Sequence, residues 1–549
     1  MTILLFPGRH LLNTNFQAGY LQSVLQMPLS QLDFLGGQAP PASTPVDHVV
    51  FAVTSSNQQH SRYNPVPFHV RAIGVDRFAR SLERAFDFDY RIVGVPHYGP
   101  TPRFAQFIIK EIAEQSEGQL QLAPENCVVL CSTPGVFEQF CALGFSILPA
   151  EYGAPHPAPL TPTALLQRIV QAGENWPHST EIREHLHPAT FDLWRDFPHV
   201  PGRVLRLWRD PLLNEEGSLT ATRDYASYAF GMGNNEIVEV KYGDICQAIV
   251  PGKIVDEGCA DGALLVRAAQ DFPDSDLIGI EITGEFMARC RERQRAGQFG
   301  NTFVHFHQRN ITQPIFEDNS IDTTICNSTV HELWSYGDGE STVLDYFRRK
   351  FEQTRPGGRL VIRDVVGPEN KEQEVYLRLE HDDGNDDDVF ATFGDSQAMA
   401  QHLAGISTYG RFKRFARDFL SAGEGQPTAD GRFAFPFREV AVDGDRFVVL
   451  SMRHAVEFMT KMDYVDNWAS EMHEEFAFWS FSEWKAALAG AGFHILENPN
   501  APAFGSRVYT SDWILKNRWQ GRVDLFHELN GRLQPLAFPP TNIVLVGEK

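Results

Sequence analysis

The strongest constraint on the fold is that strand-like and helix-like segments alternate along the chain in two separate runs. Strands joined by helices form parallel sheets with helices on their faces. We therefore predict an α/β protein with two parallel-sheet units. The strands of the first run are expected at 2–6, 46–54, 90–96, 125–132 and 146–152. Those of the second are expected at 252–259, 275–282, 302–308, 320–329, 358–366, 494–498 and 541–549.

The length of 549 residues is sufficient for two or more domains, and the breaks in the alternation suggest where they meet. We predict a first domain over 1–205, a linker over 206–235 and a second domain over 236–549. The second alternation is interrupted at about 370–475 by an aromatic and charged segment with short helical patterns. We interpret this segment as a helical insertion that covers the site.

The overall charge limits the partners that this chain can bind. Seventy acidic residues against 48 basic ones give a formal net charge of −22. This value argues against DNA and disfavours RNA, because sequence-independent binding depends on Lys and Arg neutralising phosphates. No apolar run is long enough to span a membrane, and "MTILLF" lacks the features of a signal peptide. Seven scattered cysteines without a CxxC pair predict reduced thiols and a cytoplasmic location, and no metal site is expected.

The stretch "VDEGCADGALL" (255–265) predicts a strand, a glycine turn and a helix. Gly258 and Gly262 allow a tight turn and a close approach of the backbone to a ligand. Asp256 lies at the end of the strand, and Glu281 ends the next strand. A carboxylate at that second position can accept both hydroxyl groups of a ribose. The third glycine of a dinucleotide-binding turn is missing, so a ligand without a pyrophosphate fits better.

Three further stretches follow in order: "RNIT" (309–312), "TTICNSTVHE" (323–332) and "RPGGRLVIRD" (355–364). Together with the glycine turn they resemble a class I S-adenosylmethionine-dependent methyltransferase, with Ala260 where many relatives have glycine. The resemblance implies a Rossmann-like unit with a seven-stranded sheet. Another nucleotide-binding Rossmann-like unit is the alternative. By the resemblance, S-adenosylmethionine is the cofactor, and its binding residues are Asp256, Gly258, Cys259, Gly262, Glu281, Ile282, Asn310, Ile311 and Asn327.

Three polar residues at the expected rim of this sheet are candidates for catalysis: His331, Glu332 and Asp364. Methyl transfer requires an aligned acceptor and, for some acceptors, a general base. His331 is either that base or a structural hydrogen-bonding group. Glu332 could bind an amine or His331, and Asp364 could instead anchor a loop. Five aromatic residues either line an acceptor pocket or pack the insertion onto the core: Trp334, Tyr336, His454, Tyr464 and Trp468.

The beginning of the chain, "FPGRHLLNTNFQAGYLQ" (6–22), predicts a strand, a loop and a helix. Polar residues spaced three apart at a helix N-terminus, here Thr14 and Gln17, can stabilise a phosphate with help from the helix dipole. Two later stretches carry further polar and basic residues, "AVTSSNQQHSRYNPVPFHVR" (52–71) and "HSTEIREHL" (178–186).

These stretches, with "VLCSTPGVFEQFCALGFSIL" (129–148), resemble the HxGH nucleotidyltransferase superfamily, in particular archaeal-type nicotinamide-nucleotide adenylyltransferases. Gln17 replaces the second histidine of the signature, and Phe16 replaces its glycine. An active transferase, using a nucleoside triphosphate with Mg²⁺, and a binding domain without activity therefore both remain open. The resemblance implies a nucleotide site formed by Arg9, Thr14, Gln17, Asn64, Arg71, Thr180 and Arg183.

The sequence thus predicts an S-adenosylmethionine-dependent methyltransferase that acts on a small-molecule acceptor, which a phosphate or nucleotide group could extend. Its first domain would transfer or bind a nucleotide, which would make the protein bifunctional in the first case. The alternatives are an RNA-modifying methyltransferase and a methyltransferase with an inactive ligand-binding first domain. The oligomeric state cannot be read from the sequence.

Overall fold

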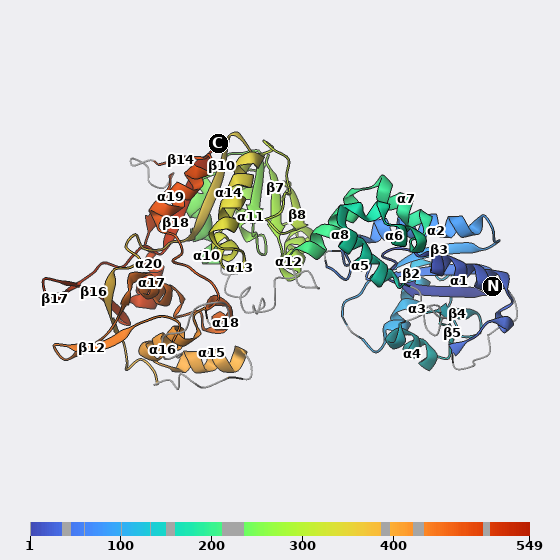
Figure 1. The fold of residues 1–549 in the computed structure, drawn as a ribbon, viewed down its shortest axis with the longest axis horizontal. Helices are drawn as coiled ribbons and strands as arrows, with labels where there is room; N and C mark the ends of the chain where they lie inside the picture. Colours follow the sequence, from blue (N-terminus) through green and yellow to red (C-terminus); the bar gives the residue numbers. More distant parts are fainter. Residues whose placement is uncertain are drawn as a thin grey trace. The chain divides into compact units, whose positions relative to one another are not determined.

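A computed structural model describes residues 2–35, 45–59, 61–99, 101–131, 133–149, 160–210, 235–385, 393, 396–420, 433–497 and 505–549. The chain divides into two compact units, Met1–Ser218 and Leu219–Lys549 (Figure 1). Most of the linker predicted at 206–235 lies outside the described residues. No helix in the described ranges is both long and apolar enough to cross a membrane.

The first unit is built on a parallel five-stranded sheet with the order β3-β2-β1-β4-β5. Alternate residues of β1 face opposite layers: Leu4 packs with helices α1 and α2, whereas Ile3 packs with α3 and α4. The strands are β1 (Ile3–Gly8), β2 (His48–Thr54), β3 (Asp89–Val95), β4 (Cys127–Leu130) and β5 (Ser146–Leu148). The α-helices are α1 (Asn15–Gln26), α2 (Phe68–Glu83), α3 (Phe104–Gln115), α4 (Pro134–Ala142), α5 (Pro162–Ala172), α6 (Thr180–His185), α7 (Pro188–Asp196) and α8 (His199–Arg209).

The second unit contains a larger sheet with the order β14-β18-β10-β9-β6-β7-β8, and β15 also pairs with β18. Strands β6 to β10 are parallel, and β18 runs antiparallel to β10. The predicted seven strands are therefore joined by an eighth. The strands are β6 (Lys253–Glu257), β7 (Asp276–Glu281), β8 (Phe303–Gln308), β9 (Ile321–Asn327), β10 (Thr354–Val365), β14 (His494–Ile495), β15 (Arg507–Tyr509) and β18 (Asn542–Glu548).

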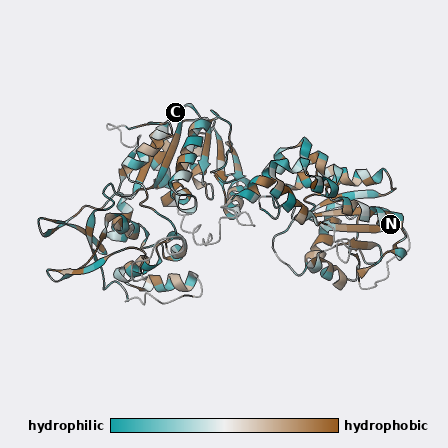
Figure 2. Cartoon of the chain, viewed as in Figure 1, coloured by the Kyte–Doolittle hydropathy of each residue, from teal (hydrophilic) through white to brown (hydrophobic). Residues whose placement is uncertain are grey.

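Helices cover both faces of this sheet, and Figure 2 shows that hydrophobic residues concentrate on its strands. One face packs against α13, α14 and α19, and the other against α10, α11 and α12. The helices are α10 (Asn235–Ile245), α11 (Ala263–Asp271), α12 (Gly284–Arg295), α13 (Val330–Tyr336), α14 (Glu340–Gln353) and α19 (Phe481–Gly490). The carboxyl ends of β6, β7, β9 and β10 thus meet at one edge of the sheet.

The insertion is a subdomain with its own antiparallel sheet, β12-β13-β11-β16-β17. The insertion therefore contains the expected helices together with a sheet that was not expected, and β16 and β17 come from beyond the predicted boundary. The sheet pairs short strands that lie far apart in the sequence, and the helical patterns within each segment do not indicate such pairing. Its elements are β11 (Glu374–Leu379), α15 (Ser396–Gly405), α16 (Thr408–Asp418), β12 (Arg438–Val442), β13 (Asp445–Ser451), α17 (Met452–Lys461), α18 (Trp468–Glu471), α20 (Asp512–Ile514), β16 (Val523–Leu529) and β17 (Arg532–Pro535).

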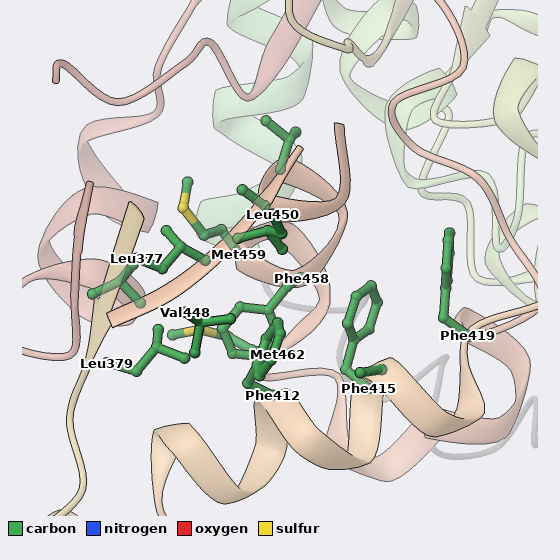
Figure 3. Packing of buried hydrophobic residues seen from close by; sticks show 14 of the residues in the cluster. Leu377, Leu379, Phe412, Phe415, Phe419, Val448, Leu450, Phe458, Met459 and Met462 are labelled. Atoms are coloured by element: carbon green, nitrogen blue, oxygen red, sulfur yellow. The ribbon is translucent and has the colours of Figure 1, made fainter. Parts of the chain in front are cut away.

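The core of this subdomain lies between the sheet and helices α16 and α17. Figure 3 shows Leu377 and Val448 on the strands facing Phe412, Phe458 and Met459 on the helices. These side chains are at most 3% exposed. The insertion therefore has a hydrophobic core of its own and can hold a chain segment firmly against the larger sheet.

Candidate functional site

A left-handed turn follows β6 at the carboxyl edge of the larger sheet. Gly258 and Gly262 have φ angles of 76° and 80°, and Ala260 has 46°. A Cβ atom on Gly258 would lie 2.4 Å from Oγ1 of Thr329, so no larger residue fits there without a shift. The turn therefore brings the backbone at Gly258 close to Thr329, just before α13, and glycine permits this close approach.

Asp256 and Asn327 supply buried polar groups beside this turn. Asp256 is fully buried in β6, and neither of its carboxylate oxygens has a hydrogen-bond partner among the described residues. Nδ2 of Asn327, at the end of β9, is also without one. Burial, together with the charges of Glu281 and Glu257, raises the pKa of Asp256 to about 7. Buried polar atoms are rarely left unpaired, so this pair fits the donors and acceptors of a bound ligand.

Glu281 joins the end of β7 to the glycine turn. Its carboxylate accepts hydrogen bonds from the backbone N–H groups of Ala260 (3.0 Å), Ile282 (2.8 Å) and Thr283 (2.8 Å). Burial raises the pKa of Glu281 to about 7, Glu332 raises it further, and the backbone N–H groups oppose both effects. The residue predicted to bind a ribose therefore also fixes the shape of the turn.

The remaining predicted cofactor residues surround the same edge. Asn310 is buried, and its Oδ1 accepts hydrogen bonds from N and Oγ1 of Thr312, both at 2.9 Å. Ile311 packs into the core under α13 and α14. Cys259 is buried in the turn, and all seven cysteines are free thiols.

Two of the three predicted catalytic residues are bonded to each other. Nδ1 of His331 lies 2.6 Å from Oδ1 of Asp364. Oδ2 of Asp364 accepts the N–H groups of Thr329 (3.1 Å) and Val330 (2.7 Å), and so caps the start of α13. Although burial raises the pKa of Asp364, the His331 imidazolium lowers it below its usual value. Asp364 is thus an anchor for α13 and for His331.

Glu332 follows His331 directly on α13. Its charge raises the pKa of both Glu281 and Lys241, so its carboxylate acts electrostatically on these two residues. Lys241 of α10 was not identified from the sequence. Burial and Arg363 lower the pKa of Lys241 to about 8, against the opposing effects of Asp364, Asp256 and Glu332. No motif marks this lysine, because it lies before the first strand of the unit.

The five aromatic candidates separate into two groups. Trp334 and Tyr336 of α13 contact the insertion: Nε1 of Trp334 donates to Glu475 (2.9 Å), and the Tyr336 hydroxyl to Glu474 (3.1 Å). The others lie within the insertion. The His454 ring stacks on Phe435, Tyr464 lies under Arg518, and Trp468 is 2% exposed in the hydrophobic core.

In the first unit, Thr14 and Gln17 bond to each other. Oγ1 of Thr14 accepts the N–H of Gln17, and Oε1 of Gln17 accepts the N–H of Thr14, both at 3.1 Å. This reciprocal pair caps α1. The Gln17 amide is therefore engaged in holding the helix.

Two arginines, Arg9 and Arg71, lie near the carboxyl ends of β1 and β2. Arg71 is 2% exposed and donates to the carbonyl oxygens of Arg9 (2.7 Å), Thr54 (2.7 Å) and Ser55 (2.8 Å). The Arg9 side chain donates to the Tyr63 carbonyl and to Thr163. Two cationic side chains thus lie near the carboxyl edge of this sheet, and burial lowers the pKa of both.

The other predicted nucleotide-binding residues lie on loops and on α6. Asn64 is buried, and its Oδ1 has no hydrogen-bond partner in the part of the chain that the structure describes. Thr180 and Arg183 are exposed on α6, where Arg183 lies over the ring of Phe191.

The unpaired Asp256 carboxylate should lower the free energy of unfolding when no ligand is bound. Its pKa is raised from 3.8 to about 7, so between these values the folded state holds a proton that the unfolded state has released. Stability therefore falls as the pH rises through this range and stays low above it. We expect Asp256→Asn to raise the free energy of unfolding at pH 8 by about 1–3 kcal/mol, with a smaller gain at pH 5.

Denaturant unfolding at the two pH values measures this gain. Asp318→Asn, at an exposed turn residue, is the matched control and should change nothing. A loss of stability in Asp256→Asn at pH 8 would contradict the described environment of this carboxylate.

Comparisons with known proteins agree with this geometry. Residues 251–416 match the family described as "Methyltransferase domain". Two curated relatives are named ribosomal RNA large subunit methyltransferase G. The protein from Shewanella loihica is 27% identical over 130 residues, which is 23% of this chain and 31% of that protein. The protein from Shewanella oneidensis is 30% identical over 79 residues, or 14% of this chain and 21% of that protein. The chain thus matches a third or less of either relative.

Solved structures that are similar to part of this chain include an S-adenosylmethionine-dependent methyltransferase from Mesorhizobium loti, at 14% identity and a TM-score of 0.30, covering 57% of this chain and 98% of that one. An S-adenosylmethionine-dependent methyltransferase from Methanosarcina mazei has 14% identity and a TM-score of 0.27, covering 56% and 96%. The family match covers β6 to β10, the glycine turn and the rim residues from Asp256 to Asp364. The second unit of this chain therefore contains a class I S-adenosylmethionine-dependent methyltransferase domain.

Proposed function

We propose that the protein transfers a methyl group from S-adenosylmethionine to a small-molecule acceptor at the carboxyl edge of the larger sheet. The observation that carries this proposal is the buried, unpaired Asp256 carboxylate beside the left-handed glycine turn. Asp256, Glu281, Asn310 and Asn327 would hold the cofactor. When bound, S-adenosylmethionine supplies an electrophilic methyl group on a sulfonium.

The chain's own contribution to the reaction is to orient the acceptor and, where necessary, to remove its proton. Asp364 and His331 are occupied with each other and with the start of α13. The charge of Glu332 raises the pKa of Lys241 and of Glu281, which supports a place for its carboxylate near the cofactor edge. We therefore assign Glu332 as the group that binds the acceptor and accepts its proton.

Glu332→Gln tests this assignment. With methyl-labelled S-adenosylmethionine and a small-molecule extract, the wild-type protein should label a product, and the variant should label it about 10²- to 10⁴-fold more slowly. Calorimetric titration should show unchanged affinity for the cofactor. Glu340→Gln, at an exposed residue at the start of α14, is the control. Absence of cofactor binding to the wild-type protein would overturn the proposed function itself.

Methylation of RNA is a second candidate, favoured by the names of the two Shewanella relatives. The net charge of −22 opposes it, because phosphate contacts require basic surfaces. The same labelling reaction distinguishes the two candidates when total RNA is added. Label in the RNA fraction and none in the small-molecule fraction would favour the second.

For the first unit we propose binding of a nucleotide, or of a substrate that carries one, in place of nucleotidyl transfer. Buried Arg71 and neighbouring Arg9 favour an anion at this edge. The Gln17 amide caps α1, and a neutral amide stabilises developing phosphate charge less well than an imidazolium. Titration with ATP and CTP in the presence of Mg²⁺ should give heat of binding without release of pyrophosphate. Release of pyrophosphate with a phosphorylated acceptor added, and recovery of the nucleotidyl group on that acceptor, would establish a transferase. Absence of heat would exclude both roles for these nucleotides.

A further inference from the structure

A segment of the insertion, residues 473–480, lies against α13 at the rim of the methyltransferase sheet. The Glu475 N–H donates to Oγ of Ser335 (2.9 Å), and its carboxylate accepts Nε1 of Trp334 (2.9 Å). The Tyr336 hydroxyl donates to Oε1 of Glu474 (3.1 Å). Three residues of one short helix thus bond to two successive residues of the insertion, so the contact has a defined register.

This register brings the carboxylate of Glu474 close to the His331 imidazole, which already contacts Asp364. Nε2 of His331 lies 3.5 Å from Oε2 of Glu474, while Nδ1 lies 2.6 Å from Asp364. The side chains of both acids are fully buried, and that of His331 is 8% exposed. The ring edge of Phe476 covers the imidazole at a centroid distance of 5.1 Å. An imidazole between two carboxylates can donate to both only when both nitrogens carry protons.

The groups around His331 favour this charged form. Burial lowers the pKa of His331, but the Asp364 carboxylate on β10 and the Glu474 carboxylate on the insertion together raise it well above its usual value. On its own helix, the Tyr336 hydroxyl bonds Glu474. Lys461 donates to the backbone carbonyl oxygen of Glu474. The two carboxylates therefore face opposite nitrogen atoms of one imidazole ring.

A buried ion pair fixes the backbone that carries Glu474. Nζ of Lys461 lies 2.8 Å from Oε2 of Glu457, and both side chains are fully buried. Lys461 also donates to the carbonyl oxygen of Glu474. Oε1 of Glu457 accepts the N–H groups of Phe476 (2.8 Å) and Ala477 (2.6 Å). The insertion thus presents Glu474 from a backbone held on both sides of the residue.

We propose that Glu474 is a positioning residue supplied by the inserted subdomain, which with Asp364 holds His331 as an imidazolium and excludes it as the proton acceptor of the reaction. The rim of the methyltransferase domain is therefore complete only when the insertion is seated on α13. Because His331 is excluded, Glu332 remains as the proton acceptor, and this assignment rests on the proposed function. The charge state inferred for His331 is independent of the proposed function.

Histidine NMR on the full-length protein tests the charge state. The His331 signal is assigned in protein labelled at the imidazole by its loss in His331→Gln. In the wild-type protein we expect it to keep imidazolium shifts between about pH 6 and pH 8, where an ordinary histidine titrates. In Glu474→Gln we expect a titration midpoint that is lower by more than about one unit. Glu474→Asp should retain the wild-type behaviour, and Glu372→Gln, at an exposed acid of the same subdomain, should have no effect.

A wild-type His331 that titrates near its ordinary pKa of about 6.5 would overturn the proposal without any variant. An unchanged His331 pKa in folded Glu474→Gln would also overturn it. Titration of the same samples with S-adenosylmethionine separates the two claims. Failure to bind the cofactor would refute the proposed function, whereas the NMR result decides the role of Glu474.

Discussion

Glu281→Ala is expected to lower the affinity for S-adenosylmethionine by about a hundredfold or more. The carboxylate holds the N–H groups of Ala260, Ile282 and Thr283 within 3.0 Å, and so ties the glycine turn to the end of β7. A hydrogen bond to a charged group contributes about 1.5–3 kcal/mol, and a tenfold change in affinity corresponds to about 1.4 kcal/mol. Losing the bond to Ala260 and a direct bond to the ligand gives the expected effect.

Calorimetric titration at neutral pH measures this loss. Glu285→Ala is the matched control, because Glu285 lies four residues further on and forms an exposed pair with Arg289. Such surface pairs contribute little, so its affinity should match that of the wild-type protein. Glu281→Gln should fall between the two, since an amide oxygen can still accept one hydrogen bond. Full cofactor affinity in Glu281→Ala would place the ligand elsewhere than at this edge.

Lys461→Met is expected to lower the free energy of unfolding by about 3–5 kcal/mol, because it leaves Glu457 as an unpaired buried charge. The ion pair is fully buried, and Glu457 also holds the N–H groups of Phe476 and Ala477. Amide hydrogen exchange should therefore accelerate at 474–477 as well as in α17. Denaturant unfolding measures the overall loss.

Lys485→Met provides an unusually close control for this prediction. Lys485 also pairs with a glutamate at 2.8 Å, but its side chain and that of Glu497 are 33% and 51% exposed. Removing the exposed pair should cost less than about 1 kcal/mol. The double variant Lys461→Met/Glu457→Gln should recover part of the loss, since no buried charge remains. Equal losses at positions 461 and 485 would show that burial does not decide the strength of these pairs.

Sequence patterns were informative wherever function or folding depends on neighbouring residues. The glycine turn at Gly258 and Gly262 is local, and its left-handed angles require the residues that the sequence shows. Strands of the parallel sheets are buried on both faces, so they appear as apolar runs. The capping role of Gln17 is also local, and its spacing from Thr14 could have indicated it.

Contacts between distant segments could not be predicted in this way. Glu474 lies 138 residues after its partner Tyr336. Nothing in the charged segment around Glu474 distinguishes this acid from its neighbours or indicates that it contacts α13. The antiparallel sheet of the insertion joins Tyr376 to Phe526 across 150 residues. Lys241 approaches the cofactor edge from a helix that precedes the first strand of the unit. Each contact arises from tertiary packing, which periodicity does not encode.

The position of β18 has a consequence for how the second unit is synthesised. Residues 542–548 pair with 359–365 of β10 on one side and with β14 and β15 on the other. This strand leaves the ribosome after the whole insertion, yet it belongs to the interior of the sheet. During translation, β10 therefore exposes an unpaired edge until the insertion has been made, and such nascent edges are prone to aggregate. The inserted subdomain has its own core, so it can fold while the larger sheet still awaits this strand.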